Sequence, residues 1–146
     1  IRRGDEIWQY ANCRMANGGL ATVRFTQRLD GFFSLDAGDQ AGIVVTRPFV
    51  FQGDKLTLNV DAKSGRVKVA IVALHGKEYT GYNVASTNPP KRGLPGFGIK
   101  DCDLIKTDSV RHVVTWKGCP DVGNLAGQVV RLRFEMQNAK LYAFQF

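Results

Sequence analysis

The strongest constraint on the fold is an alternation of apolar and polar residues near the C-terminal end of the chain. The first run alternates apolar Val130, Leu132, Phe134 and Met136 with charged Arg131, Arg133 and Glu135. A period of two is typical of a β-strand with one buried and one solvent-exposed face. After Gln137–Ala139 a second run alternates Tyr142, Phe144 and Phe146 with Leu141, Ala143 and Gln145. We predict that these two strands form a β-hairpin, covered so that its aromatic edge does not invite aggregation.

The same pattern recurs upstream and predicts an all-β domain. Lys55–Asp61 and Arg66–Leu74, joined by Lys63-Ser64-Gly65, are expected to form a second hairpin. Further strands are expected at Glu6–Ala11, Leu20–Leu29, Phe32–Asp36, Ile43–Thr46, Phe97–Cys102 and Ser109–Lys117, with one helical turn at Asp121–Gly127. Nine or ten short strands separated by turn residues predict an antiparallel two-sheet β-sandwich.

Charge limits the partners. The 146 residues carry a net charge of +7, which favours an anionic partner, although a solvated basic surface explains the charge equally well. The basic residues are spread along strands, and no nucleic-acid-binding motif accompanies them, so nucleic acid is an unlikely partner. No apolar stretch approaches the ~20 residues of a membrane-spanning helix, so no membrane partner is expected.

No catalytic constellation is visible in the sequence. There is no Gly-x-Ser-x-Gly elbow, no phosphate-binding GxGxxG and no HExxH. His112 alternates with Val110, Val114 and Trp116, which favours a core histidine over a ligand. Cys102 and Cys119 are both expected in loops, where a disulfide between them is possible. We therefore expect this chain to be non-catalytic.

Five phrases, in this order, carry a resemblance to a known family: RLDGFFSLDAG (28–38), KLTLNVDAKSG (55–65), GFGIKDCD (96–103), DSVRHVVTWKG (108–118) and AGQVVRLRFEMQNAKLYAFQF (126–146). Together they resemble the C-terminal β-sandwich module of bacterial proteins that carry a five-bladed propeller similar to glycoside hydrolase families 32 and 43. The resemblance implies a jelly-roll-like, lectin-like sandwich at residues 28–146. Residues 1–27 then look like the end of the preceding propeller and its linker, with Ile1 a cut end and Trp8 packed on that propeller.

The resemblance also implies a setting. The parent protein is expected to be a glycoside hydrolase, with an extracellular or periplasmic location favoured if it acts on polysaccharide. The pattern departs from the family at residues 76–98, where a short connection is replaced by a long Pro-rich loop. Cys119 is a second departure, because a small or polar residue is usual there.

The Pro-rich loop is the first candidate glycan site, because sugar binding needs aromatic faces beside polar side chains. It supplies the aromatic residues Tyr79, Tyr82 and Phe97 and the polar residues Asn83, Asn88, Lys91 and Arg92. Alternatively, its tyrosines only cover one end of the sandwich. A secondary basic face, Arg66, Lys68, Arg131 and Arg133, suits an anionic glycan but is also explained as a solvated surface.

A structural Ca²⁺ is a further hypothesis, with Asp30, Asp36 and Asp39 as oxygen ligands. Turn formation explains the same aspartates. The resemblance, taken together with these candidate sites, implies a non-catalytic carbohydrate-binding-type accessory module of a bacterial carbohydrate-active enzyme, with a polysaccharide or oligosaccharide as partner. The alternative is a structural domain that packs on the catalytic propeller of the same chain. A large uncovered apolar surface would favour this alternative.

Overall fold

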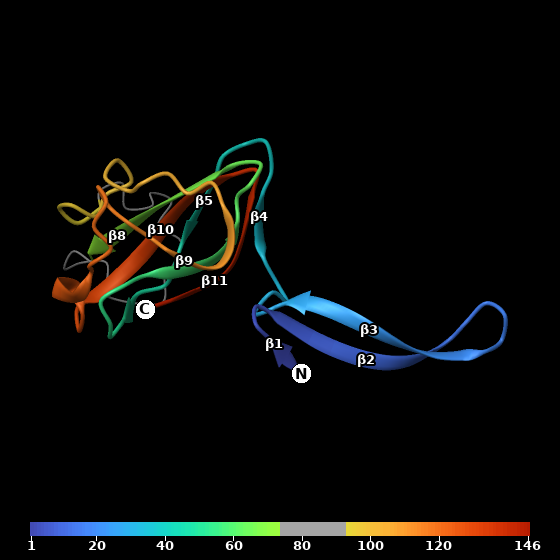
Figure 1. Cartoon of the computed structure of the whole chain (residues 1–146). Coiled ribbons are helices and arrows are strands. Elements are labelled where there is room, and N and C mark those ends of the chain that lie inside the picture. Colours follow the sequence, from blue (N-terminus) through green and yellow to red (C-terminus); the bar gives the residue numbers. More distant parts are fainter. Residues whose placement is uncertain (74–92) are drawn as a thin grey trace.

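The computed structural model describes residues 1–73 and 93–146, and this part of the chain is all-β and antiparallel (Figure 1). Its strands are β1 (Arg2–Arg3), β2 (Glu6–Arg14), β3 (Leu20–Arg28), β4 (Leu35–Ala37), β5 (Gly42–Val45), β6 (Phe49–Val50), β7 (Thr57–Asp61), β8 (Arg66–Ala73), β9 (Asp108–Val113), β10 (Val129–Gln137) and β11 (Ala139–Gln145). Among the described residues, one 3₁₀ turn, η1 (Gly123–Leu125), precedes β10. Its N-cap is Val122, without a side-chain cap, and the Asp121 carboxylate just before it accepts a hydrogen bond from the Gly123 amide. No helix among these residues is long and apolar enough to cross a membrane.

Two sheets form the predicted sandwich, and the C-terminal strands lie at their centres. In the first sheet one edge of β10 pairs with β8. Its other edge pairs with β6 at Val129 and Val130, and then with β5 from Arg133 to Met136. Pro48 interrupts that second edge, where a missing N–H does least harm. The second sheet has the order β4-β11-β7-β9. The antiparallel two-sheet fold expected from the sequence is confirmed.

Both predicted hairpins are wrong. β7 belongs to the second sheet and β8 to the first, and β10 and β11 are divided in the same way. In the described ranges no two consecutive sandwich strands are hydrogen-bonded to each other. The chain instead passes between the sheets at nearly every connection, which is in keeping with a jelly-roll-like sandwich.

The connection from β7 to β8 and the connection from β10 to β11 are both short, and they lie against each other at Gly65. A Cβ built on Gly65 would overlap the carbonyl oxygens of Gln137 and Asn138. Asn138 itself has a φ of 45°, a left-handed conformation that Asn tolerates better than most residues. The two connections therefore pack backbone against backbone at the place where each passes from one sheet to the other.

A β-bulge changes which residues of β11 face the core. Leu141 pairs with Val60 and Ala143 with Asn59, so the register shifts at Tyr142. Ala139 and Leu141 are buried before the bulge. After it Phe144, still 37% exposed, lies against the rings of Phe49 and Phe134, and Phe146 stacks on Phe51 with 3.9 Å between ring centroids. The aromatic end of the chain therefore closes the core as expected. It does so from the second sheet, by packing against Phe51, and not as the partner strand of β10.

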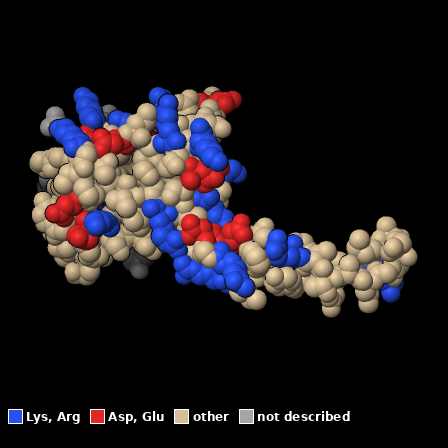
Figure 2. All heavy atoms as spheres, in the orientation of Figure 1, with Lys and Arg blue, Asp and Glu red and all other residues tan. Residues whose placement is uncertain are grey.

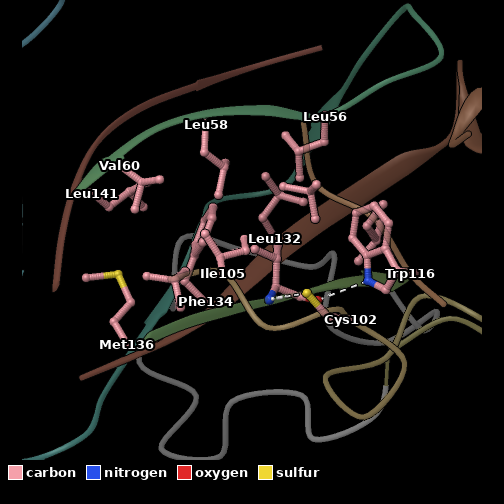
Figure 3. Close-up of a cluster of buried hydrophobic side chains, with 14 of the residues drawn as sticks. Leu56, Leu58, Val60, Cys102, Ile105, Trp116, Leu132, Phe134, Met136 and Leu141 are labelled. Atoms are coloured by element: carbon pink, nitrogen blue, oxygen red, sulfur yellow. Dashed lines mark hydrogen bonds between the residues drawn. The ribbon is translucent and has the colours of Figure 1, made fainter. Parts of the chain in front are cut away.

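The core lies between the two sheets (Figure 3). Val130, Leu132, Phe134 and Met136 of β10 are each at most 2% exposed, which confirms the predicted inward face. They meet Leu58 and Val60 of β7 and Leu141 of β11. Full burial of one such side chain stabilises the fold by about 1.5–3 kcal/mol.

The free edge of β8 is covered by residues 94–105, so the strand expected at Phe97–Cys102 is replaced by turns. Ile71 donates to the Phe97 carbonyl and Val67 to the Ile105 carbonyl. The Trp116 indole N–H donates to the Val69 carbonyl at 3.0 Å, and the Val69 amide donates to Cys102 Sγ. Side chains and turns thus satisfy the backbone groups that an edge strand leaves unpaired.

The first three strands form a separate sheet that projects from the sandwich (Figure 1). β2 and β3 pair without a bulge over nine residues each, so β2 extends beyond the strand expected at Glu6–Ala11. In the described part of the chain, no strand of the sandwich pairs with this sheet through a backbone ladder. The domain boundary expected at residue 28 stays a prediction.

Candidate functional site

The projecting hairpin β2–β3 has one face without any charged side chain. Cross-strand pairing and alternation place eight residues on this uncharged face: Ile7, Gln9, Ala11, Cys13, Ala21, Val23, Phe25 and Gln27. Phe25 is 52% exposed there. Figure 2 shows few charged atoms along the outer part of the hairpin. A two-stranded hairpin is marginally stable in water without a further covering layer.

The opposite face of the hairpin carries its arginines. Trp8 lies between Arg3 and Arg24, whose guanidinium carbons are 5.6 and 4.2 Å from the ring centroid. Tyr10 and Leu20 on this face are 53% and 77% exposed. Among the described strands, β3 has no partner on its outer edge. No proline or bulge protects that edge from pairing with another strand.

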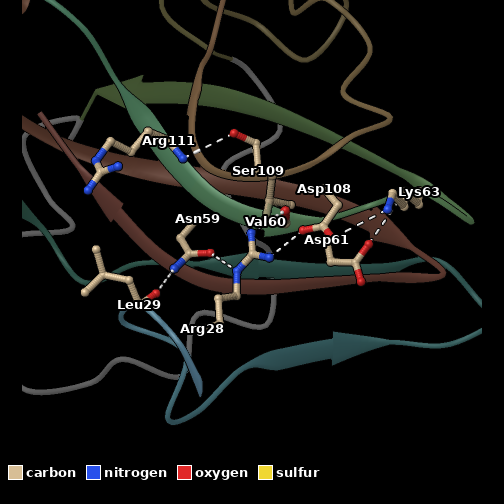
Figure 4. A network of polar contacts seen from close by, with 9 residues as sticks. All are labelled: Arg28, Leu29, Asn59, Val60, Asp61, Lys63, Asp108, Ser109 and Arg111. Atoms are coloured by element: carbon tan, nitrogen blue, oxygen red, sulfur yellow. Dashed lines mark hydrogen bonds and ion pairs between the residues drawn. The ribbon is translucent and has the colours of Figure 1, made fainter. Parts of the chain in front are cut away.

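A polar network anchors the base of the hairpin to β7 (Figure 4). The Arg28 guanidinium donates to the Asn59 side chain, to the Val60 carbonyl and, in an ion pair, to Asp108. Asn59 is 4% exposed and donates to the Leu29 carbonyl at 2.6 Å. Arg28 also lies over the Tyr142 ring. Because charge-assisted hydrogen bonds are directional, this network fixes where the hairpin leaves the sandwich.

An apolar groove opens between β4 and β5, just after the hairpin. Its volume is about 400 Å³, and its lining includes Phe33, Leu35, Val44, Phe134 and Phe144 but no charged residue. At its rim Phe33 is 89% exposed and Leu35 53% exposed. Exposed apolar residues that gather around one groove are typical of an interaction surface.

A polar pocket of about 290 Å³ lies on the outer face of the second sheet, beside the hairpin base. Arg2, Asp30, Arg111 and Gln145 line it. Arg111 forms an ion pair with Asp5, while the Asp30 carboxylate has no hydrogen-bond partner among the described residues. The pocket combines donors and acceptors for a hydroxylated ligand.

The structure leaves the predicted glycan loop largely untested. Tyr79, Tyr82, Asn83, Asn88, Lys91 and Arg92 lie outside the described residues. Phe97 is described, and its ring packs edge-on against Trp116 with 5.4 Å between centroids. Because Phe97 packs against the core, its ring does not serve as an open stacking face for a sugar.

The secondary basic face is not the open stripe that the sequence suggested. Arg133 is only 9% exposed and pairs with Glu135 at 2.6 Å. Glu135 also stands directly opposite Lys68, while Arg66 and Arg131 remain on the same face. This carboxylate among the cations lowers the attraction of the face for an anionic glycan.

The three aspartates proposed for Ca²⁺ do not form a site. Asp30, Asp36 and Asp39 are all described, and no group of three or more metal-ligating side chains occurs in this part of the chain. Asp36 instead binds Ser34 and Lys140, and these two partners hold the pKa of its carboxyl below the ordinary value. The structure does not support the calcium hypothesis.

The cysteines and His112 have simple roles. Cys13, Cys102 and Cys119 are all free thiols, so the possible disulfide is not formed. Burial raises the pKa of the Cys102 thiol, which keeps it protonated. His112 lies opposite buried Leu58 on the neighbouring strand. Burial lowers the pKa of His112, which favours the neutral form of its imidazole.

The uncharged hairpin face and the apolar groove were missed by the sequence reasoning. The alternation in Leu20–Leu29 contained the signal for the first, because Ala21, Val23 and Phe25 share one face. The groove has no local signal, since its lining comes from four separate segments. Comparisons with protein-family models, with curated proteins and with solved structures found no match.

Proposed function

We propose that this chain is a non-catalytic β-sandwich accessory module of a carbohydrate-active enzyme, and that it works by packing against the neighbouring catalytic domain. The observation that carries the proposal is the projecting hairpin, which has an uncharged face and an open strand edge. The sandwich has its own buried apolar core, whereas nothing in the described chain covers the hairpin. The resemblance to modules that follow a glycosidase-like propeller names the partner.

The three free cysteines provide a test of this docking. In the chain alone, iodoacetamide should label Cys13 and exposed Cys119 but not buried Cys102. In the polypeptide of the native gene, we expect Cys13 to be protected, because it lies on the uncharged face, while Cys119 stays reactive. Equal labelling of Cys13 in both proteins, or a native polypeptide without a catalytic domain, would overturn the proposal. Hydrolysis of aryl glycosides by the chain alone would overturn its non-catalytic part.

Glycan binding is the second candidate function, and the polar pocket beside the hairpin base favours it. Its volume of about 290 Å³ is at the lower end of ligand sites, which suits one sugar ring better than a long chain. Saturation-transfer NMR with glucose, galactose, mannose and xylose would test it. We expect transfer that Asp30→Asn abolishes and the loop control Asp39→Asn retains. Transfer unchanged in Asp30→Asn would exclude this pocket.

A further inference from the structure

We propose that the open edge of β3 pairs with the same edge of a second copy of this chain. Residues 20–26 of the two copies run antiparallel, with Val23 facing Val23 across a two-fold axis. The two hairpins then join into one sheet, flanked on each side by a β2 strand. This goes beyond the docking proposed above, because the uncharged faces of both hairpins lie on one side of the joined sheet and stay open to a neighbouring domain.

The backbone of β3 offers hydrogen bonds along this edge. The Met15 amide donates to the Gly19 carbonyl at one end of the hairpin, and the Leu29 amide donates to the Asp5 carbonyl at the other. Because such pairs alternate along an antiparallel ladder without a bulge, the odd-numbered residues of β3 direct their N–H and C=O groups toward β2. The even-numbered residues therefore direct theirs to the open edge. A row of such groups without a partner strand is a template for another strand.

The sequence of β3 suits a second copy of itself. Its stretch along the open edge contains one charged side chain, Arg24. With Val23 on the two-fold axis, Arg24 of each copy stands opposite Thr22 of the other. On the uncharged face, Phe25 stands opposite Ala21. Apolar side chains therefore meet apolar ones across the two copies, and the two arginines are not opposed.

The neighbouring registers are less favourable. With Arg24 on the two-fold axis, two like charges face each other, which is destabilising. With Phe25 on the axis, Thr22 must pair with Arg28. The Arg28 carbonyl already accepts a hydrogen bond from the Gly31 amide at 3.1 Å, and the Arg28 side chain is held in the polar network at the hairpin base. With Thr22 on the axis, fewer residues pair before the turn at the hairpin tip begins.

The outer hairpin is also the part of the molecule where two copies of a basic chain can approach each other. The net charge of +7 makes two copies repel. The hairpin projects from the sandwich and shows few charged atoms along its outer part (Figures 1 and 2), so the pairing joins weakly charged segments. It also converts a two-stranded ribbon into a wider and more stable sheet. A ladder this short buries less surface than a stable dimer needs, so the pairing is weak and depends on protein concentration.

Disulfide trapping in this chain tests the register. Serine first replaces Cys13 and Cys119, the two thiols that are not buried. Val23→Cys is then compared with the matched control Phe25→Cys on the same face. Val23 meets its own copy at a non-hydrogen-bonded position, where the two Cα atoms of a pair lie about 4.5 Å apart, within reach of a disulfide. We expect Val23→Cys to form a covalent dimer under mild oxidation at least ten times faster than Phe25→Cys, as followed by non-reducing electrophoresis.

Sedimentation equilibrium with charge variants of Thr22 gives a second measurement. Thr22→Asp sets a carboxylate opposite Arg24 of the other copy, whereas Thr22→Lys sets a like charge there. Both variants remove the hydroxyl that donates to the Asn12 side chain, so they differ only in charge and size. Because the two-fold axis repeats this pair, we expect Thr22→Asp to tighten self-association about fivefold and Thr22→Lys to weaken it about fivefold.

A chain that sediments as a monomer at every concentration would overturn the proposal. Equal trapping of Val23→Cys and Phe25→Cys, or equal self-association of the two Thr22 variants, would overturn it as well. The protection of Cys13 in the native polypeptide does not depend on this pairing, because Cys13 lies on β2 and on the uncharged face. The proposed function therefore stands or falls separately.

Discussion

The sandwich and the hairpin are built from the same alternating pattern, yet only the sandwich buries it. In β10 every second residue meets the facing sheet and is almost fully buried. In β3 Ala21, Val23 and Phe25 alternate with polar residues in the same way, but Phe25 remains about half exposed. In β2 apolar residues lie on both faces, and Tyr10 is also about half exposed. Alternation therefore predicts that a segment is a strand with two unlike faces; it does not predict what covers either face. Among the described residues, no second sheet covers the hairpin, and Phe25 on its uncharged face stays open to solvent.

We expect the largest loss of stability from a substitution at Gly65, where the β7–β8 and β10–β11 connections are in contact. Gly65→Ala should destabilise the sandwich by about 3 kcal/mol or prevent folding, because overpacking against fixed backbone is costly. Gly38→Ala is the matched control, since a Cβ there meets nothing within 4 Å. Urea titration followed by circular dichroism would measure both. Equal stability of the two variants would contradict the packed crossings.

Truncating one apolar residue in each region compares them directly. Leu132→Ala should lower the free energy of unfolding by about 2–5 kcal/mol, because it leaves a cavity in the core. Phe25→Ala should change it by no more than about 0.5 kcal/mol, as for an exposed site. Chemical denaturation of the isolated chain gives both values. A similar loss for the two variants would mean that the hairpin face is covered within the chain itself.

Arg28 links the two regions, and its replacement should have an intermediate effect. Arg28→Lys keeps the charge but cannot donate to Asn59, Asp108 and the Val60 carbonyl together. We expect a loss of about 1 kcal/mol, because the network is partly exposed to solvent. The control Arg14→Lys, near the hairpin tip, should be neutral. A neutral Arg28→Lys would show that the hairpin is not anchored by this network.

The smallest predicted effect is a pH dependence of the sandwich from His112. Burial lowers its pKa in the folded chain, whereas the unfolded value is about 6.5. Between these two values the unfolded chain binds a proton that the folded chain does not, so stability rises with pH across this window and is lost as the pH falls. His112→Gln should flatten that slope as the pH falls below the unfolded pKa of about 6.5. The lowered pKa values of Asp36, Asp101 and Asp103 act at more acidic pH.

The sequence predicted the strands better than their partners. The inward face of β10, the buried Trp116 and the turn at Gly123–Leu125 all follow from local patterns, and each is found. The short turns at Lys63-Ser64-Gly65 and Asn138 fit either a hairpin or a crossing between sheets. What decides between them is the close approach of Gly65 to Gln137 and Asn138, residues more than seventy positions away in the chain.

The candidate site was predictable only in part for a related reason. Aromatic residues in the Pro-rich loop drew attention, but Phe97 is used to cover the edge of β8. Arg133 looked solvent-exposed because it alternates with core residues, yet it is buried and paired with Glu135. The groove and the polar pocket arise where segments distant in sequence meet. No local pattern encodes such a meeting.

Native-state hydrogen exchange on the isolated chain tests the contrast between sandwich and hairpin most directly. We predict that central amides of β10, such as Leu132 and Phe134, exchange only through global unfolding. Amides in the middle of the hairpin, such as Ala11 and Val23, should exchange orders of magnitude faster, because local opening exposes little apolar surface. Equal protection of the two regions would contradict a self-sufficient sandwich carrying an uncovered hairpin.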